Sequence, residues 1–173
     1  MLPTIALVGR PNVGKSTLFN KLTHSRDALV ADVPGLTRDR RYGRMEILES
    51  QVTLIDTGGL FGEHVLADEL TGQTQLAVDE ADLVLLLLDG RDGVTASDEE
   101  VVTYLRKSNV AFLPVINKID GLNEDHVISD FVRFGFSEYA LISAIHNRGL
   151  KKLREIIAEK LSLLEIPLSP DLR

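Results

Sequence analysis

Short apolar segments alternate along the chain with segments whose apolar residues recur at helical spacing. This alternation is typical of an α/β fold, in which helices pack on both faces of a largely parallel sheet. We expect strands over Thr4–Val8, Arg41–Leu48, Gln51–Ile55, Leu83–Asp89, Ala111–Ile116 and Tyr139–Ile142. We expect helices over Lys15–Thr23, Ala67–Asp79, Ser97–Ser108, Glu124–Phe134 and Leu150–Leu164.

Two of the expected strands differ from the others. The other four are near-continuous apolar runs, as expected for strands covered on both faces. Only Glu49 and Ser50 separate Arg41–Leu48 from Gln51–Ile55, which is too short for a crossover helix and predicts an antiparallel hairpin. The pattern therefore predicts a doubly wound α/β fold, with a mostly parallel six-stranded sheet and one antiparallel edge strand.

Several local signals refine this prediction. Ser97 followed by Glu100 predicts a capping box at the start of a helix. The apolar stripe of the last helix is typical of core packing, so residues 1–165 are predicted to form one domain. The tail Ile166–Arg173 has two prolines after a helix and resembles a linker, which we expect to lead to a second domain. Two aperiodic stretches, Ser25–Arg40 and Thr57–Leu66, are long enough to suggest functional loops.

Composition excludes several classes of protein. The 173 residues carry a formal net charge of −7, which argues against a bare electrostatic nucleic-acid binder, so no DNA partner is expected. The absence of cysteine excludes disulfides and thiolate zinc sites and is compatible with a cytoplasmic location, which we expect. The apolar runs are too short to cross a bilayer, so no membrane partner is expected. The four histidines show no metal-binding spacing: His24, His64, His126 and His146.

A phosphate-binding motif follows the first expected strand. The segment Gly9–Ser16 (GRPNVGKS) fits GxxxxGK[ST] and opens a helix. Its glycines allow backbone N–H groups to converge on phosphates, and the helix N-terminus adds partial positive charge. We expect Lys15 to bridge the terminal phosphates and the Ser16 hydroxyl to bind Mg²⁺; the alternative is a glycine turn that merely feeds a helix. The expected nucleotide-binding residues here are Gly9, Asn12, Val13, Gly14, Lys15, Ser16 and Thr17.

A base-recognition motif follows the fifth expected strand. Asn117–Asp120 (NKID) lies where ligands bind in open α/β sheets, and it matches N/T-K-x-D. A carboxylate at Asp120 can accept hydrogen bonds from the N1–H and the exocyclic amine of guanine, whereas adenine has neither donor there. We expect the stem of Lys118 to lie over the base and Asn117 to tie the loops together. Ser143 and Ala144 are the usual partners, with the Ala144 N–H donating to guanine O6. Alone, this short motif also fits a polar turn.

A third motif follows the hairpin. Asp56–Gly59 (DTGG) fits DxxG, in which Asp56 is expected to hold a magnesium-bound water and Gly59 to present its N–H to the γ-phosphate. The alternative is a glycine-rich turn. In the first long loop, Thr37 is the candidate for a second magnesium-binding hydroxyl, and Thr23 is its competitor.

Taken together, these motifs resemble the Era/TrmE/EngA group of P-loop GTPases, and most closely the first GTPase domain of the EngA (Der) family. The residues that carry the resemblance are Gly9–Asn20, Asp32–Arg40 (DVPGLTRDR), Asp56–Gly59, Asn117–Asp120 and the Ser143–Ala144 pair. The resemblance spans essentially the whole chain and favours Thr37 as the magnesium ligand. It implies a role in assembly of the large ribosomal subunit, with that subunit or its rRNA as partner. That family carries two such domains in tandem followed by a KH-like domain.

Hydrolysis needs an explanation, because Leu60 follows DTGG and has no group that orients water. Resemblance to TrmE-like proteins suggests that Asn12 coordinates K⁺, which would supply charge to the phosphates. The alternative is that Asn12 only stabilises the loop. The candidate catalytic residues are Lys15, Thr37, Gly59 and Asn12.

A basic cluster beside the first long loop suggests RNA or partner contact, or a solvated strand face: Arg38, Arg40, Arg41 and Arg44. The overall expectation is Mg²⁺-dependent binding of GTP and hydrolysis to GDP and phosphate. Two loops, about Ala28–Arg41 and Thr57–Gln75, would order around the γ-phosphate and relax with GDP. One alternative is a GTP-sensing interaction module with little hydrolysis, and another is an ATP-dependent kinase or ATPase, against which Asp120 argues.

Overall fold

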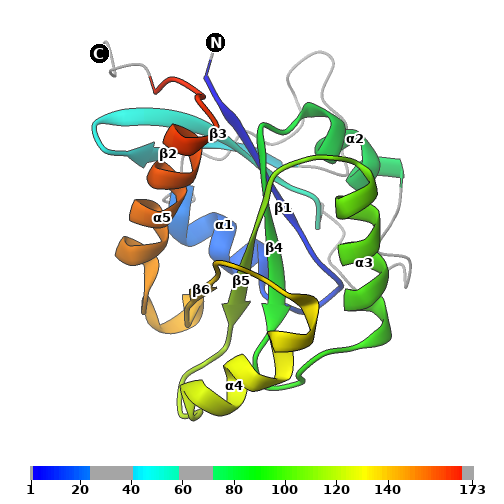
Figure 1. Cartoon of the computed structure of the whole chain (residues 1–173). Helices are drawn as coiled ribbons and strands as arrows, with labels where there is room; N and C mark the ends of the chain where they lie inside the picture. Colours follow the sequence, from blue (N-terminus) through cyan, green and yellow to red (C-terminus); the bar gives the residue numbers. More distant parts are fainter. Residues whose placement is uncertain (1, 24–40, 59–71, 169–173) are drawn as a thin grey trace.

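The structure is a computed structural model that describes residues 2–23, 41–58 and 72–168. A central sheet lies between two layers of helices (Figure 1). Its strands are β1 (Thr4–Val8), β2 (Arg41–Ile47), β3 (Ser50–Asp56), β4 (Leu83–Asp89), β5 (Phe112–Asn117) and β6 (Ala140–Leu141). The α-helices are α1 (Lys15–Thr23), α2 (Gly72–Glu80), α3 (Ala96–Lys107), α4 (Glu124–Phe131) and α5 (Leu150–Leu163), with 3-10 turns η1 (Val132–Phe134) and η2 (Ala144–His146).

The sheet has the predicted topology. Its strand order is β2-β3-β1-β4-β5-β6, and β2 pairs antiparallel with β3 while the other pairs are parallel. The prediction of a mostly parallel six-stranded sheet with one antiparallel edge strand is confirmed. Leu48 and Glu49 form the hairpin turn, with φ of 47° and 64°, one residue earlier than the expected turn at Glu49 and Ser50. Two positive φ values at the centre of a two-residue turn match the right-handed twist of the flanking strands.

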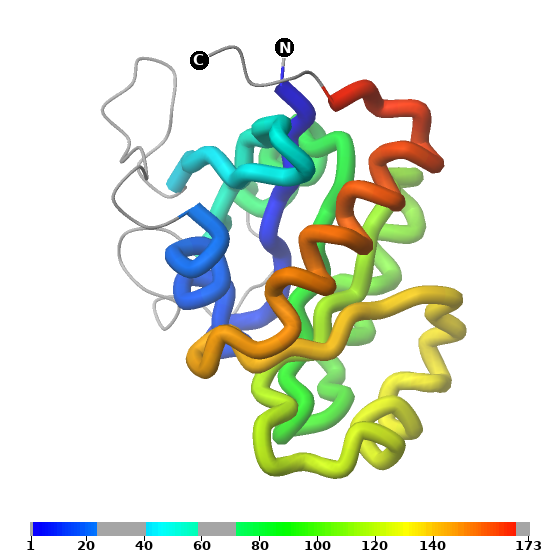
Figure 2. Tube along the Cα trace, turned by 90° about the vertical axis from the view of Figure 1, so that its left-hand side faces the viewer, coloured from blue at the N-terminus to red at the C-terminus, as the bar shows by residue number. Residues whose placement is uncertain are grey.

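Two apolar layers cover the two faces of the sheet. One packs α1 and α5 against the sheet, through residues such as Phe19, Leu22 and Leu153. The other packs α2, α3 and α4 against the opposite face, through residues such as Val101 and Phe131. Figure 2 views the molecule from the side of α1 and α5. All seven residues of β4 are buried, as expected for a strand covered on both faces.

Element boundaries differ from the expectations in several places. The capping box of α3 was predicted at Ser97 and Glu100, but Thr95 is the N-cap, and Asp98 completes the box. Thr95 has the extended backbone that an N-cap requires, whereas Ser97 already lies inside the helix. The α-helix expected over Glu124–Phe134 ends at Phe131 and continues as η1. The expected start of α2 at Ala67 lies outside the described residues.

This topology gathers the sequence motifs at one edge of the sheet. The carboxyl ends of β1, β3, β4 and β5 lead directly into Gly9, Thr57, Gly90 and Lys118. In open α/β sheets ligands bind beyond this edge. Within the part of the chain that the structure describes, no helix is both long and apolar enough to span a bilayer.

Candidate functional site

The phosphate and base motifs meet through the side chain of Asn117. Its Nδ2 donates to the Val13 carbonyl at 2.9 Å, and its Oδ1 accepts the Ala144 N–H at 3.0 Å. Asn117 is buried, so both ends of the amide are satisfied where water does not compete. This one residue joins three loops that are far apart in the sequence, as expected for Asn117. The Ala144 N–H, expected to face guanine O6, holds Asn117 in this structure instead.

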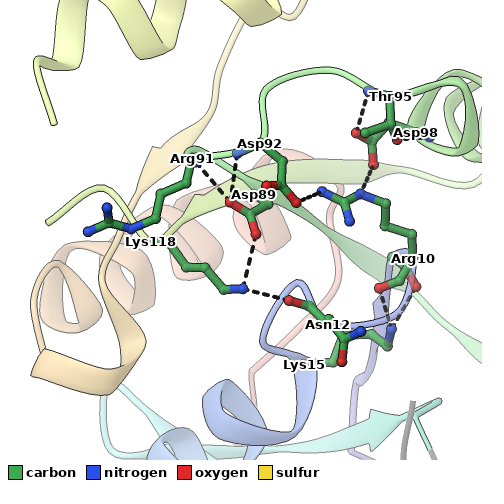
Figure 3. Close-up of polar contacts among 10 residues, drawn as sticks. Arg10, Asn12, Lys15, Asp89, Arg91, Asp92, Thr95, Asp98 and Lys118 are labelled. Atoms are coloured by element: carbon green, nitrogen blue, oxygen red, sulfur yellow. Dashed lines mark hydrogen bonds and ion pairs between the residues drawn. The ribbon is translucent and has the colours of Figure 1, made fainter. Parts of the chain in front are cut away.

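Lys118 makes a second link between the same two loops. Its Nζ donates to the Asn12 carbonyl at 2.6 Å and lies 3.0 Å from Asp89 Oδ2 (Figure 3). Lys118 has a φ of 65° and Asn12 a φ of 68°, so both loops turn sharply where they meet. The side chain expected to lie over a base is therefore anchored at its charged end.

The phosphate loop has the form of a cradle. Lys15 is buried, and its Nζ donates to the Gly9 carbonyl at 2.6 Å and to the Arg10 carbonyl at 3.0 Å. Gly14 has a φ of 103°, and a Cβ there would overlap the side-chain amide of Asn117. Only glycine satisfies both conditions. The predicted phosphate loop thus forms a tight turn that encloses the Lys15 ammonium.

Oxygen donors suited to Mg²⁺ converge beside this loop. Ser16 Oγ donates to Asp56 Oδ2 at 3.3 Å, and the Gly58 N–H donates to Asp56 Oδ1 at 2.9 Å. Hydroxyl and carboxylate oxygens, completed by phosphates and water, are the ligands that Mg²⁺ prefers. Among residues 2–23, 41–58 and 72–168, no group of three or more His, Cys, Asp or Glu side chains is placed to hold a metal. The Ser16 hydroxyl and the Asp56 carboxylate are the two oxygen ligands that the described residues bring together here.

Arg41 supplies a positive charge to the same carboxylate. Its Nη2 lies 2.7 Å from Asp56 Oδ2, and its Nη1 donates to Asn20 Oδ1 at 3.2 Å. Its guanidinium carbon is 4.6 Å from the centre of the Phe19 ring, a cation–π distance. Asp56 is 0% exposed and Arg41 is 16% exposed. Arg41 therefore does not belong to an exposed basic cluster. Arg44 is exposed, and Arg38 and Arg40 lie outside the described residues.

The carboxylate of Asp120, which is expected to recognise the base, is held from two sides. Ser143 Oγ donates to Asp120 Oδ1 at 2.9 Å, and Arg91 Nη2 donates to Oδ2 at 3.0 Å. His146 Nε2 lies 3.5 Å from Oδ2. The Ser143 hydroxyl, and then the Arg91 guanidinium, lower the pKa of Asp120 against the opposing effect of burial. The side chain that would accept guanine donors is thus held ionised.

The last residue of β4, Asp89, and the loop that follows it connect the phosphate and base loops. Burial alone would raise the pKa of Asp89, but hydrogen bonds from Lys118 and from the N–H groups of Asp92 and Arg91 lower it. Arg10 of the phosphate loop pairs with Asp92 at 2.9 Å and lies 3.5 Å from Asp98 at the start of α3. These contacts form one continuous polar network (Figure 3).

Some predicted site residues are not placed. Thr37 and Gly59 lie outside the described residues and stay predictions. The competitor Thr23 is buried in α1, where its Oγ1 donates to the Phe19 carbonyl at 2.7 Å, so its hydroxyl is already engaged inside the helix. Asn12 is exposed, and its carbonyl, rather than its amide, makes the contact with Lys118. Thr17 follows Ser16 in the first turn of α1.

From the sequence we assign no site role to Arg10, Asp89 or Arg91, and we place Arg41 in a basic surface cluster rather than beside Asp56. A signal existed for Arg41, because alternation places it on the same side of β2 as the buried Gly43, Met45 and Ile47. A signal existed for Asp89 as well, because it is a lone carboxylate at the end of a fully apolar strand. Nothing in the sequence pairs Arg91 with Asp120.

Comparison with known proteins decides the family. The profile described as "50S ribosome-binding GTPase" matches residues 4–118, which include the phosphate motif, the DTGG motif and the start of NKID. The chain belongs to the 50S ribosome-binding GTPase family. Membership makes the chain a GTPase domain, and it accords with the geometry of the motifs.

Individual relatives support this assignment. The chain is 54% identical over 154 residues to GTPase Der of Marinomonas sp. and 52% identical over 163 residues to GTPase Der of Stenotrophomonas maltophilia. These matches cover 88% and 93% of this chain but 35% of each relative, so the chain spans about a third of their length. The resemblance to the EngA (Der) family is confirmed, while correspondence to its first GTPase domain stays a prediction.

Solved structures share the fold. The crystal structure of Era in complex with MgGDPNP and nucleotides 1506–1542 of 16S ribosomal RNA matches with a TM-score of 0.75 at 29% identity, covering 99% of this chain and 59% of that one. The G domain of the FeoB iron transporter of T. maritima matches with a TM-score of 0.67 at 24% identity, covering 92% of this chain and 98% of that one. The latter likeness concerns the fold alone.

Proposed function

We propose that the chain binds GTP together with Mg²⁺, hydrolyses it to GDP and phosphate, and acts as a nucleotide-dependent switch. The observation that carries this proposal is the contact of the phosphate and base motifs across more than a hundred residues of sequence. Asn117 reaches the Val13 carbonyl at 2.9 Å, and Lys118 reaches the Asn12 carbonyl at 2.6 Å. One ligand with a phosphate end and a base end can contact both motifs.

The expected roles follow from the groups present. The backbone N–H groups of the phosphate loop and the Lys15 ammonium would bind the phosphates, and the contacts of Lys15 Nζ with the Gly9 and Arg10 carbonyls support this role because they hold the ammonium at the loop. The carboxylate of Asp120 would accept the N1–H and the amine of guanine. With adenine it would lose both partners, at a cost of about 1–3 kcal/mol. These roles support GTP over ATP as substrate.

Mg²⁺ would be held by Ser16, with Asp56 and Thr37 completing its surroundings. It would neutralise charge that develops on the phosphates during transfer. Gly59 would present its N–H to the γ-phosphate. In place of a water-orienting glutamine, Asn12 would hold K⁺ near the phosphates. Equal turnover in potassium and sodium at the same ionic strength would exclude this role of K⁺.

The switch would act in assembly of the large ribosomal subunit, in the cytoplasm, with that subunit or its rRNA as partner. Support for the large subunit comes from the family and from similarity to GTPase Der. The structure of Era in complex with a segment of 16S ribosomal RNA, which belongs to the small subunit, supports only an rRNA partner in general. Co-sedimentation with purified 50S subunits in GTP, in GDP and without nucleotide tests this role. The proposal requires more bound protein in one nucleotide state than in the others.

The function is tested by a nucleotide panel. GTP, GDP, ATP and XTP compete for a fluorescent guanine nucleotide, with and without Mg²⁺. We expect guanine nucleotides to win, and Asp120→Asn to weaken GTP and favour XTP, because the new amide can donate to the extra carbonyl of xanthine. Asp125→Asn, a surface carboxylate in the first turn of α4, is the matched control. Equal competition by ATP and GTP would refute the proposal.

A GTP-sensing module with little hydrolysis is the second candidate, and Leu60 after DTGG favours it. Single-turnover measurement of phosphate release separates the two. Release that does not exceed the rate in the Lys15→Ala variant would favour the sensing module, because that variant lacks the ammonium expected to stabilise the transferred phosphoryl group.

A further inference from the structure

The guanidinium of Arg91 contacts Asp120 at two points. Its Nη2 donates to the Asp120 backbone carbonyl at 2.7 Å and to the carboxylate Oδ2 at 3.0 Å. On the other side of the carboxylate, Ser143 Oγ donates to Oδ1 at 2.9 Å. The two carboxylate oxygens therefore have different protein donors, one from the loop after β4 and one from the loop after β6.

The number of acceptor sites leaves room for a ligand. An ionised carboxylate offers about two acceptor positions on each oxygen. Ser143 takes one position on Oδ1 and Arg91 takes one on Oδ2. His146 Nε2 lies farther away, 3.5 Å from Oδ2, beyond the usual range of an N–H···O hydrogen bond. Both oxygens therefore keep acceptor capacity for the two adjacent donors of guanine, N1–H and the exocyclic amine. The protein donors thus set the direction of the carboxylate while leaving it able to bind a base through both oxygens.

We propose that Arg91 is a positioning residue for guanine selection, which holds the Asp120 carboxylate with both oxygens directed to the base. The proposal rests on the proposed guanine-nucleotide function. It concerns discrimination between bases more than overall affinity, because a base that uses one carboxylate oxygen depends less on the direction of the carboxylate plane than a base that uses both.

The backbone of Arg91 is itself held in place by Asp89. Asp89 Oδ1 accepts the Arg91 N–H at 2.8 Å and the Asp92 N–H at 3.1 Å, while Asp89 Oδ2 faces Lys118. Figure 3 shows the Asp89 carboxylate between the Arg91 backbone and the Lys118 ammonium. An isolated ion pair with exposed partners contributes little energy. An arginine on a fixed turn that contacts both the backbone and the side chain of Asp120 can instead determine its orientation.

The test compares Arg91→Ala and Arg91→Lys with the unchanged chain. Arg133→Ala is the matched control, because Arg133 is similarly exposed and pairs with Glu99 at 2.7 Å away from the base loops. Affinities for GDP, IDP and ADP are measured by competition at neutral pH. IDP keeps the N1–H of guanine but lacks its exocyclic amine, so it reports binding through one carboxylate oxygen.

We expect Arg91→Ala to lower the affinity for GDP on the order of 10-fold, as for loss of one oriented hydrogen bond to a charged group. The affinity for IDP should fall less and the affinity for ADP should not change, so the preference for GDP over IDP should shrink. Arg91→Lys should restore part of that preference, and Arg133→Ala should leave it unchanged.

Three results separate the possibilities. If the unchanged chain does not prefer GDP over ADP, the proposed function fails, and with it the basis of this inference. If the chain prefers GDP but Arg91→Ala keeps the full preference for GDP over IDP, the positioning role is wrong. Tighter GDP binding in Arg91→Ala also overturns the proposal, because it would mean that Arg91 competes with guanine for Asp120.

Discussion

Removal of the Arg41 guanidinium should destabilise the nucleotide-free domain strongly. Asp56 is fully buried, and Arg41 Nη2 lies 2.7 Å from its Oδ2 and compensates its negative charge. Loss of one partner of a buried ion pair typically costs about 3–5 kcal/mol, because the other charge is left uncompensated. Asp56 would keep its hydrogen bonds from Ser16 and Gly58, so the lower end of that range applies. We expect Arg41→Ala to lower the free energy of unfolding by about 3 kcal/mol.

The assay is thermal unfolding after nucleotide and Mg²⁺ have been removed. In a domain of this size each kcal/mol shifts Tm by roughly 2–4 °C, so Arg41→Ala should lower Tm by about 6–12 °C. Arg44→Ala is the control: Arg44 is exposed on the same strand, with a 3.4 Å contact to Gln51, and surface changes of this kind usually stay within about 0.5 kcal/mol. In the double variant Arg41→Ala/Asp56→Asn the loss of stability should be smaller than in Arg41→Ala, because position 56 then carries no uncompensated buried charge.

Saturating MgGDP provides a second arm of this experiment. A divalent cation beside Asp56 would replace the missing positive charge, so the Tm gap between Arg41→Ala and the unchanged chain should narrow when MgGDP is added. The reasoning is refuted if Arg41→Ala unfolds at the same temperature as Arg44→Ala in the absence of nucleotide. In that case Asp56 would not depend on Arg41 for its charge.

Three further predictions concern the site itself. Gly14→Ala should abolish detectable GDP binding, because its φ of 103° is strained for alanine and the Cβ would overlap Asn117, whereas Gly72→Ala, in open space, should bind GDP normally. Asn117→Ala should lower Tm and weaken GDP together, since the Val13 carbonyl and the Ala144 N–H lose their partner at about 1–3 kcal/mol each, while Asn117→Asp should keep the bond from Ala144 only. The Ser143 hydroxyl lowers the pKa of Asp120, so the carboxylate should stay ionised, and GDP should stay bound, as the pH falls from neutral to the ordinary aspartate pKa of about 3.9. Ser143→Ala should raise the pKa of Asp120, so the GDP affinity of that variant should begin to fall at a higher pH than that of the unchanged chain.

The fold was predictable because its signals are local. The fully apolar run Leu83–Asp89 indicates a strand covered on both faces, and the short gap after Ile47 allows only a hairpin. The exact turn was not predictable, because Leu48 and Glu49 are not the glycine or asparagine that usually mark positive φ. The sequence also did not decide the start of α3. Thr95 and Ser97 both have a carboxylate three residues later, so either could have formed the capping box.

The motifs of the site were predictable, but the pairs that hold them in place were not. Asp120, Asn117 and Ser16 belong to short patterns whose spacing reflects the chemistry of a nucleotide. Arg91 contacts Asp120 across 29 positions, and Arg41 contacts Asp56 across 15. Such pairs depend on which strands lie side by side, and the residue type alone suggests only a solvated surface charge.

Strand register turns part of this missing information into a rule. In the parallel pair β4–β5, Asp89 lies opposite Asn117, so the last residue of one strand is adjacent to the first residue of the base motif. A carboxylate at this position on β4 is therefore brought beside Lys118, and it is 3.0 Å from Nζ. A buried carboxylate at the carboxyl edge of a parallel sheet needs a cation, and the register provides Lys118. The strand order and the sequence together therefore identify Asp89 as part of the site.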